Sequence, residues 1–132
     1  MSTITRIVTG QVAAGATAAF TANVKKLDGT SYAPAEISAI TATIVDNGAY
    51  SNATPTTVTG FDGKSLTVAD VMFTATTKTY NGREYTRNFE WIPDIADLPF
   101  KDAGHIYQVT ITFTPATAGG LCSPLVFQIK TV

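Results

Sequence analysis

Apolar and polar residues alternate most regularly between positions 107 and 114. The apolar members of this pattern are Tyr107, Val109, Ile111 and Phe113, and glutamine or threonine separates them. Successive side chains of a β-strand point to opposite faces, so this period of two predicts a strand with one buried face. The residues from Asp102 to His105, just before it, include a glycine and predict a tight turn.

Shorter alternations predict strands on both sides of this one. A first strand around Ile7 and Val8 is expected to end at Gly10, and residues 49–60 are expected to form a loop or a weak edge strand. The other strands have apolar positions at Phe20, Ala22 and Val24, at Ile40, Ala42 and Ile44, and at Leu125, Phe127 and Ile129.

A hairpin is predicted where Asn81 and Gly82 separate residues 74–80 from residues 83–91. Asn-Gly favours the two-residue turns that join antiparallel strands, because both central positions of such a turn need a positive φ.

The returning strand of this hairpin carries two large aromatic residues, Phe89 and Trp91, at positions of one parity. They are expected to face the core, because alternation then places Asn88 and Glu90 on the outward side. Pro93 is expected to end the strand, since proline cannot donate a hydrogen bond to a neighbouring strand.

About seven or eight short antiparallel strands, separated by Gly, Asn and Asp turns, predict an all-β fold of the Greek-key sandwich or small-barrel kind. Leu66, Val68 and Val71 could continue a strand, and the alternative is one short helical turn near Val68–Met72, because Thr67 is followed three residues later by Asp70. The 132 residues suit a single β-sandwich domain, with residues 1–10 as an N-terminal arm or an edge strand.

Composition supports the all-β prediction and narrows the function. Threonine is the most frequent residue, and it suits half-exposed strand positions. Charged residues make up only 14% and the net charge is −1, so we expect no binding to nucleic acid, which depends on clustered Lys and Arg. Such a weakly charged surface permits self-association or docking on a large assembly.

The start of the chain lacks the charged and apolar regions of a signal peptide, and no run of apolar residues is long enough to span a bilayer. We therefore expect no membrane partner, and synthesis in a cytoplasm.

Isolated reactive residues argue against an enzyme. His105 is the only histidine and Cys122 the only cysteine, so neither a two-histidine metal site nor a disulfide within the chain can form. We expect His105 to lie solvated in its turn and Cys122 to pack as a small hydrophobic residue, although the two could form a nucleophile pair. No catalytic residue, cofactor site or metal site is predicted.

Acidic residues offer two alternatives to this reading. Asp94, Asp97 and Asp102 could ligate calcium, but turn and cap roles are favoured because their spacing differs from that of known calcium loops. Glu84 and Glu90 share a strand face roughly 20 Å apart, which is too far for a glycosidase pair.

Surface features that could bind or carry sugars are few. Asn52 begins a glycosylation sequon that we expect to be silent. Tyr50 and Tyr80 lie near turns and could stack on sugars, whereas Trp91 and Tyr107 are expected to face inward.

Residues 66–132 contain an ordered set of elements that resembles a known group of proteins. The set consists of the run from Leu66 to Phe73, the Asn88–Phe89 pair before a proline-bearing segment, then Gly104, Tyr107, Val109 and Phe113, and a closing strand with Phe127. This order resembles that of small proteins encoded in the structural gene clusters of tailed bacteriophages. A turn feeding a strand with Tyr107 near its start also resembles a corner of immunoglobulin-type sandwiches.

The resemblance implies an immunoglobulin-like β-sandwich that attaches to virions. The expected function is a non-enzymatic virion structural protein, such as a capsid decoration or cement protein or a neck-associated protein. Its expected partners are other virion proteins and copies of itself, contacted by the N-terminal segment Met1 to Gly10 and by exposed edge strands. The alternative is a carbohydrate-binding or host-adhesion module.

Overall fold

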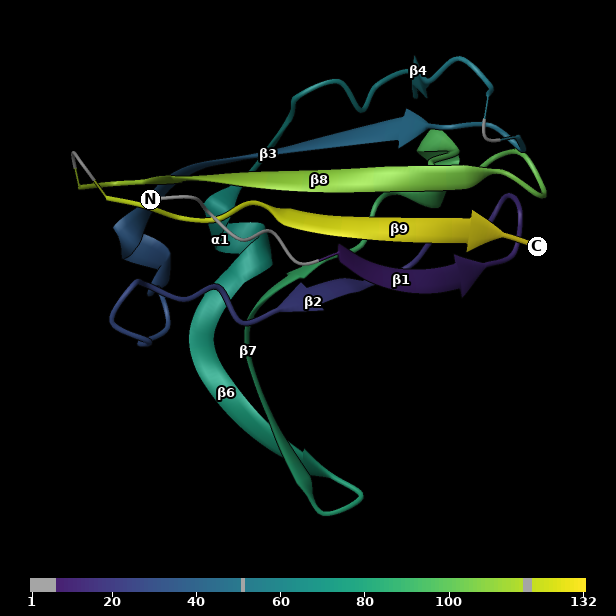
Figure 1. Cartoon of the computed structure of the whole chain (residues 1–132). Helices are drawn as coiled ribbons and strands as arrows, with labels where there is room; N and C mark the ends of the chain where they lie inside the picture. The colour runs from purple at the N-terminus through teal and green to yellow at the C-terminus, as the bar shows by residue number, and fades with distance from the viewer. Residues whose placement is uncertain (1–6, 51, 118–119) are drawn as a thin grey trace.

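The computed structural model describes residues 7–50, 52–117 and 120–132, and β-strands dominate it (Figure 1). The larger sheet has the order β1 (Ile7–Val12), β9 (Leu125–Thr131), β8 (Ile106–Pro115), β3 (Ile37–Asp46) and β4 (Thr56–Thr57), and β5 (Lys64–Leu66) also pairs with β3. The smaller sheet has the order β2 (Phe20–Ala22), β7 (Arg83–Trp91) and β6 (Met72–Tyr80). This two-sheet architecture confirms the prediction of an all-β sandwich.

In the described part of the chain, three short helical segments connect the strands. They are η1 (Pro34–Glu36), α1 (Val68–Val71) and η2 (Ile95–Asp97). The helical turn predicted near Val68–Met72 is therefore confirmed as α1, but the Thr67 side chain makes no cap hydrogen bond. The turn is instead held by the Asp70 N–H, which donates to the Thr67 carbonyl at 3.0 Å, and by burial of Val71.

The first strand differs from its prediction in length and direction. β1 continues through Gly10 to Val12, and it runs parallel to β9, where an antiparallel arrangement was expected. Gly10 faces Ile129 in this register, and a Cβ there would lie 3.4 Å from the Ile129 Cδ1 atom. The ladder with β9 offsets the weak strand preference of glycine. Of the predicted N-terminal arm or edge strand, residues 7–10 belong to edge strand β1, and residues 1–6 lie outside the described residues.

Aromatic side chains join the two sheets in one core. Phe20 on β2 lies 4.9 Å from Phe127 on β9 between ring centroids, and Phe89 on β7 lies 5.3 Å from Phe113 on β8. The positions predicted to face inward are buried at Phe20, Val24, Ile40, Ala42, Ile44, Phe89, Trp91, Tyr107, Val109, Ile111, Phe113, Phe127 and Ile129.

Asn88 corrects the prediction for β7, because it was expected on the outward side and is fully buried beside Phe89. The register between Met72↔Phe89 and Thr76↔Arg87 places three residues of β6 opposite Asn88 alone, so strict alternation stops there. The Asn88 Oδ1 atom accepts from the Val24 N–H at 2.7 Å, and its Nδ2 donates to the carbonyls of Val24 and Tyr32 at 2.9 Å. The amide thus continues the pairing of the smaller sheet after β2 has ended.

The β6–β7 hairpin forms as predicted and projects away from the sandwich (Figure 1). Asn81 and Gly82 have φ values of 49° and 76°, as the turn requires. We call residues 76–87 the ribbon. All of them are exposed except Arg87, which is half-buried. Within the described residues, the ribbon strands pair only with each other.

Candidate functional site

One end of the larger sheet gathers polar side chains from two segments that are distant in the sequence. Asp46 ends β3, and the turn before β8 supplies Asp102 and His105. The His105 Nδ1 atom lies 2.9 Å from both carboxylate oxygens of Asp46. Because its side chain is only 28% exposed, His105 is a partly buried hydrogen-bond partner of Asp46, where a solvated turn residue was expected.

Tyr107 on β8 holds this turn in place. The β3–β8 register places it opposite Asp46, and its hydroxyl accepts a hydrogen bond from the Asp102 N–H at 3.0 Å. Burial raises the pKa of the Tyr107 hydroxyl, which therefore stays protonated. Thr131 on β9 holds the other side of the turn, since its hydroxyl donates to the Asp102 carbonyl and accepts from the His105 N–H at 3.1 Å.

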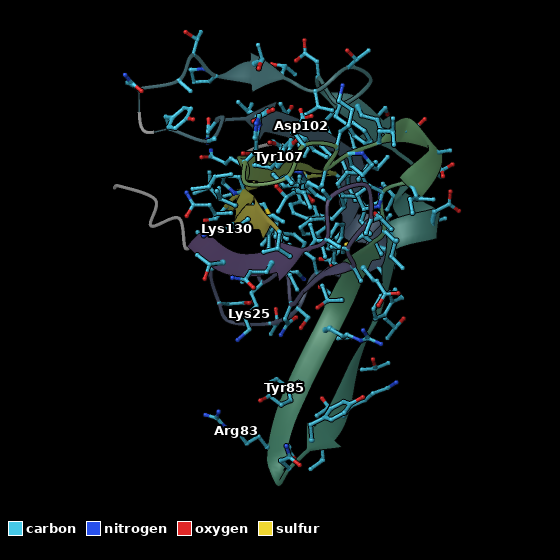
Figure 2. All side chains as sticks on the ribbon, turned by 90° about the vertical axis from the view of Figure 1, so that its right-hand side faces the viewer. Lys25, Arg83, Tyr85, Asp102, Tyr107 and Lys130 are labelled. Atoms are coloured by element: carbon cyan, nitrogen blue, oxygen red, sulfur yellow. The ribbon has the colours of Figure 1, made fainter. Side chains whose placement is uncertain are left out.

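A pocket of about 300 Å³ opens beside this cluster. Its charged lining consists of Asp46, Asp97, Asp102 and Lys101, and residues 56–59 form another wall. We call it the acidic pocket, because three carboxylates face one ammonium group. It lies at the upper end of the molecule in Figure 2, where Asp102 and Tyr107 are labelled.

The structure divides the predicted trio of Asp94, Asp97 and Asp102. Asp94 caps η2, where its carboxylate accepts from the Ala96 N–H at 3.0 Å, so a cap role is confirmed there. Asp97 and Asp102 line the acidic pocket together with Asp46, which sequence reasoning missed. Asp46 precedes Asn47 and Gly48 in an ordinary turn signal, and only strand pairing brings it to Asp102.

The other predicted reactive residues are engaged elsewhere. Cys122 is half-buried against the core, as expected, and burial raises the pKa of its thiol to about 11. Its Sγ atom donates to the Ser123 carbonyl, so Cys122 and His105 each have a different partner. Glu90 forms an ion pair with Arg87 at 2.9 Å, and Glu84 lies on the ribbon.

The tyrosines near turns are exposed as predicted. Tyr50 is 76% exposed and Tyr80 is 67% exposed, whereas Trp91 and Tyr107 are buried. Tyr85 is 52% exposed and is a further candidate, which sequence reasoning did not single out.

The ribbon carries the second candidate surface. Its register pairs Lys78 with Tyr85 and Tyr80 with Arg83, so these four side chains share one face. Arg87, opposite Thr76, extends the same face toward the sandwich. We call the five residues the cationic-aromatic face. Figure 2 shows Arg83 and Tyr85 projecting from the same side of the ribbon.

This face borders a hollow of about 390 Å³ where the ribbon meets β2, lined by Thr21, Lys78, Tyr80, Tyr85 and Arg87. Glu84 pairs with Thr79 and therefore lies on the opposite face. The alternation of Arg83, Tyr85 and Arg87 along β7 could have revealed this surface. The same alternation continues into Phe89 and Trp91, however, and so predicts a core face equally well.

Comparisons with family models, with curated proteins and with solved structures find no match to this chain. Among the described residues, no helix has the length and apolar character needed to cross a bilayer.

Proposed function

We propose that this chain is a non-enzymatic structural protein of a bacteriophage virion. It docks on a symmetric assembly as a capsid decoration or cement protein, or as a neck-associated protein. The observation that carries this proposal is the ribbon, a projecting arm whose aromatic and cationic side chains are exposed beyond a sandwich with its own core.

A ribbon of this kind is a reason to expect a partner. An isolated two-stranded hairpin is at best marginally stable in water, because it has no second layer to cover it. Tyrosine and arginine are enriched at the energetic centres of protein interfaces. Tyr80, Arg83 and Tyr85 therefore form a surface suited to docking, on an arm that extends beyond the core.

The sandwich supports the immunoglobulin-like part of the proposal. Its strand order, with β9, β8 and β3 in one sheet and β2, β7 and β6 in the other, is that expected of strands G, F and C facing strands B, E and D. The Tyr107 hydroxyl bonds to the backbone five residues upstream, as in the tyrosine corner of that fold. These features support an immunoglobulin-like arrangement, which is the fold that the resemblance to phage structural proteins implies.

The surface outside the ribbon is compatible with a protein that is made and assembled in a host cytoplasm. A virion protein is made in the host without an export signal, and docking on a repeated lattice tolerates a neutral surface. The threonine side of β8 is exposed at Thr112 and Thr114. Within the described residues, edge strand β1 pairs with β9 alone, so its other side can accept a strand from a partner.

Shortening the ribbon is expected to remove the protein from particles. A variant that lacks residues 76–79 and 84–87 keeps the Asn81–Gly82 turn and moves the paired Tyr80 and Arg83 to the positions of Thr76 and Arg87. The ribbon becomes roughly 13 Å shorter while the sandwich is unchanged. We expect occupancy on purified particles to fall at least about tenfold, because the docking residues no longer reach their partner. Occupancy is measured by quantitative mass spectrometry of banded virions.

The matched control replaces Thr77 and Thr86 with alanine. These residues hydrogen-bond to each other at 2.8 Å on the opposite face of the same ribbon, so occupancy should be retained. Full occupancy of the shortened variant would reject the ribbon as the docking arm. Absence of the wild-type chain from purified particles would reject the virion function.

The alternative function, a carbohydrate-binding or host-adhesion module, is favoured by one observation: Tyr80 and Tyr85 border the 390 Å³ hollow with Lys78 and Arg87. That function predicts glycan-array binding that is lost in Tyr80→Ala and Tyr85→Ala and retained in Tyr50→Ala. The virion proposal instead expects an array that stays blank at high protein concentration.

A further inference from the structure

We infer that the cationic-aromatic face of one copy docks into the acidic pocket of a second copy of this chain, so that copies join head to tail. The inference rests on the proposed function and deepens it, because it names the partner of the ribbon.

Positive and negative side chains gather on different surfaces of the molecule, although the net charge of the chain is only −1. The ribbon carries Lys78, Arg83 and Arg87 against a single acidic residue, Glu84. The acidic pocket has the opposite balance, with Asp97 and Asp102 against Lys101, while Asp46 is hydrogen-bonded to His105. Potentials of opposite sign on two patches favour their encounter and fix the register of an interface.

Several of these charges have no ion-pair partner within the described part of the chain. The ion pairs found there are Lys26–Glu36 and Arg87–Glu90, and the Asp46 carboxylate is hydrogen-bonded to His105. On the ribbon, Lys78 and Arg83 are therefore available to a partner. In the pocket, the carboxylates of Asp97 and Asp102 are available in the same way. Lys78, Arg83 and Asp97 are exposed and Asp102 is half-buried, so none of the four must break an ion pair of its own in order to bind a partner.

The acidic pocket also has room for side chains from the tip of the ribbon. The ribbon narrows to the Asn81–Gly82 turn, which places Tyr80 and Arg83 side by side at its tip. The acidic pocket has a volume of about 300 Å³, and Asp97, Asp102 and Leu98 are among its lining residues. It therefore offers carboxylates and apolar surface to one or two such side chains. Arginine matches carboxylates with two parallel hydrogen bonds, and tyrosine adds contact area at low entropic cost.

A single molecule cannot make this contact with itself. The ribbon tip lies at the lower end of the molecule in Figure 1, whereas β4, whose residues Thr56 and Thr57 line the acidic pocket, lies at the upper end. A contact between two different patches on identical chains is heterologous, and repeating it produces a closed ring or an open filament. Such assemblies suit the symmetric particle of the proposed function.

The test uses charge reversal on purified full-length protein, followed by sedimentation velocity over a concentration series at low and physiological salt. We expect the wild type to self-associate more weakly as salt rises, because the Debye length falls to about 8 Å at 0.15 M. Arg83→Glu and Asp97→Lys should each raise the dissociation constant at least about tenfold. Both residues are exposed, so the variants should fold, which thermal melting checks.

One mixture and two further variants make the test specific. Combining the Arg83→Glu chain with the Asp97→Lys chain should restore association, since the intact ribbon of the second meets the intact pocket of the first. The double variant Arg83→Glu/Asp97→Lys should also regain association, because its charges are exchanged. Lys25→Glu lowers the net charge by two, as Arg83→Glu does, but lies outside both surfaces and should leave association unchanged.

Several outcomes would overturn the inference and leave the proposed function standing. One is a wild type that binds particles but remains monomeric at every concentration. Another is Arg83→Glu lowering particle occupancy without any self-association, which would assign the ribbon to a different acidic protein. Association that persists in both single variants would place the interface elsewhere. Conversely, salt-sensitive association of a chain absent from particles would support the inference and reject the virion function.

Discussion

Replacing Asn88 with alanine is expected to lower the free energy of unfolding by about 3–5 kcal/mol. The substitution removes three buried hydrogen bonds at once and strands the Val24 N–H and the Tyr32 carbonyl, whereas the Val24 carbonyl keeps the bond that it accepts from the Tyr32 N–H at 2.9 Å. Each buried polar group without a partner costs about 1–3 kcal/mol, and water entering the site recovers part of the total. Urea denaturation followed by tryptophan fluorescence gives the difference, since Trp91 is the only tryptophan.

The control for this variant is Asn52→Ala, at an exposed position. A surface change of this kind should alter stability by no more than about 0.5 kcal/mol. If Asn88→Ala lost less than about 1 kcal/mol, the side chain would not be the link that continues the smaller sheet beyond β2.

Replacing Phe20 with alanine is expected to lower the free energy of unfolding by about 3–5 kcal/mol. Phe20 is 2% exposed, and its ring lies against Phe127 of the larger sheet and against Trp91 and Phe100, at centroid distances of 4.9, 5.9 and 6.1 Å. β2 has only three residues, so the ring provides much of what holds this strand to the opposite sheet. The loss combines the transfer of the ring to water with the cavity left between the sheets.

Thermal and urea unfolding of Phe20→Ala measure this effect, with Tyr85→Ala as the control that removes an aromatic ring from the exposed ribbon. The control should change stability by no more than about 0.5 kcal/mol. Equal losses in the two variants would contradict a core that joins the sheets through Phe20. Because Phe20 and Asn88 both secure the β2 region, the double variant should lose less than the sum of the single losses.

Folding and docking are expected to depend on different residues of the chain. Phe20 and Asn88 lie in the sandwich, and their replacement should destabilise it. Arg83 and Asp97 lie on exposed surface, and their replacement should change association while melting remains the same. Measuring both properties for all four variants therefore tests whether folding and docking occupy different residues.

Local signals were enough to predict much of the sandwich. The alternation of Tyr107, Val109, Ile111 and Phe113 survives in β8 because one side of that strand faces the core throughout. Asn81 and Gly82 determine the hairpin by themselves, since few other residue pairs accept two positive φ values in succession. Both signals act over a few residues, so they do not depend on the rest of the chain.

Alternation was misleading on β7, where the same parity has different meanings along one strand. Phe89 and Trp91 enter the core, whereas Tyr85 and Arg87 lie on a ribbon that has left it. Nothing local marks the boundary, because it depends on where the opposite sheet ends. The burial of Asn88 was missed for the same reason, since its partners Val24 and Tyr32 are 64 and 56 residues away.

The sequence by itself determined the fold class, the hairpin turn and the inward faces of the long strands, because propensity and periodicity act between near neighbours. Tertiary structure alone decided how the polar residues are grouped. Strand pairing brings Asp46 to Asp102 and His105, and the hairpin register places Lys78 and Tyr80 beside Tyr85 and Arg83. These groupings join residues from different strands, so a pattern read along one strand cannot contain them.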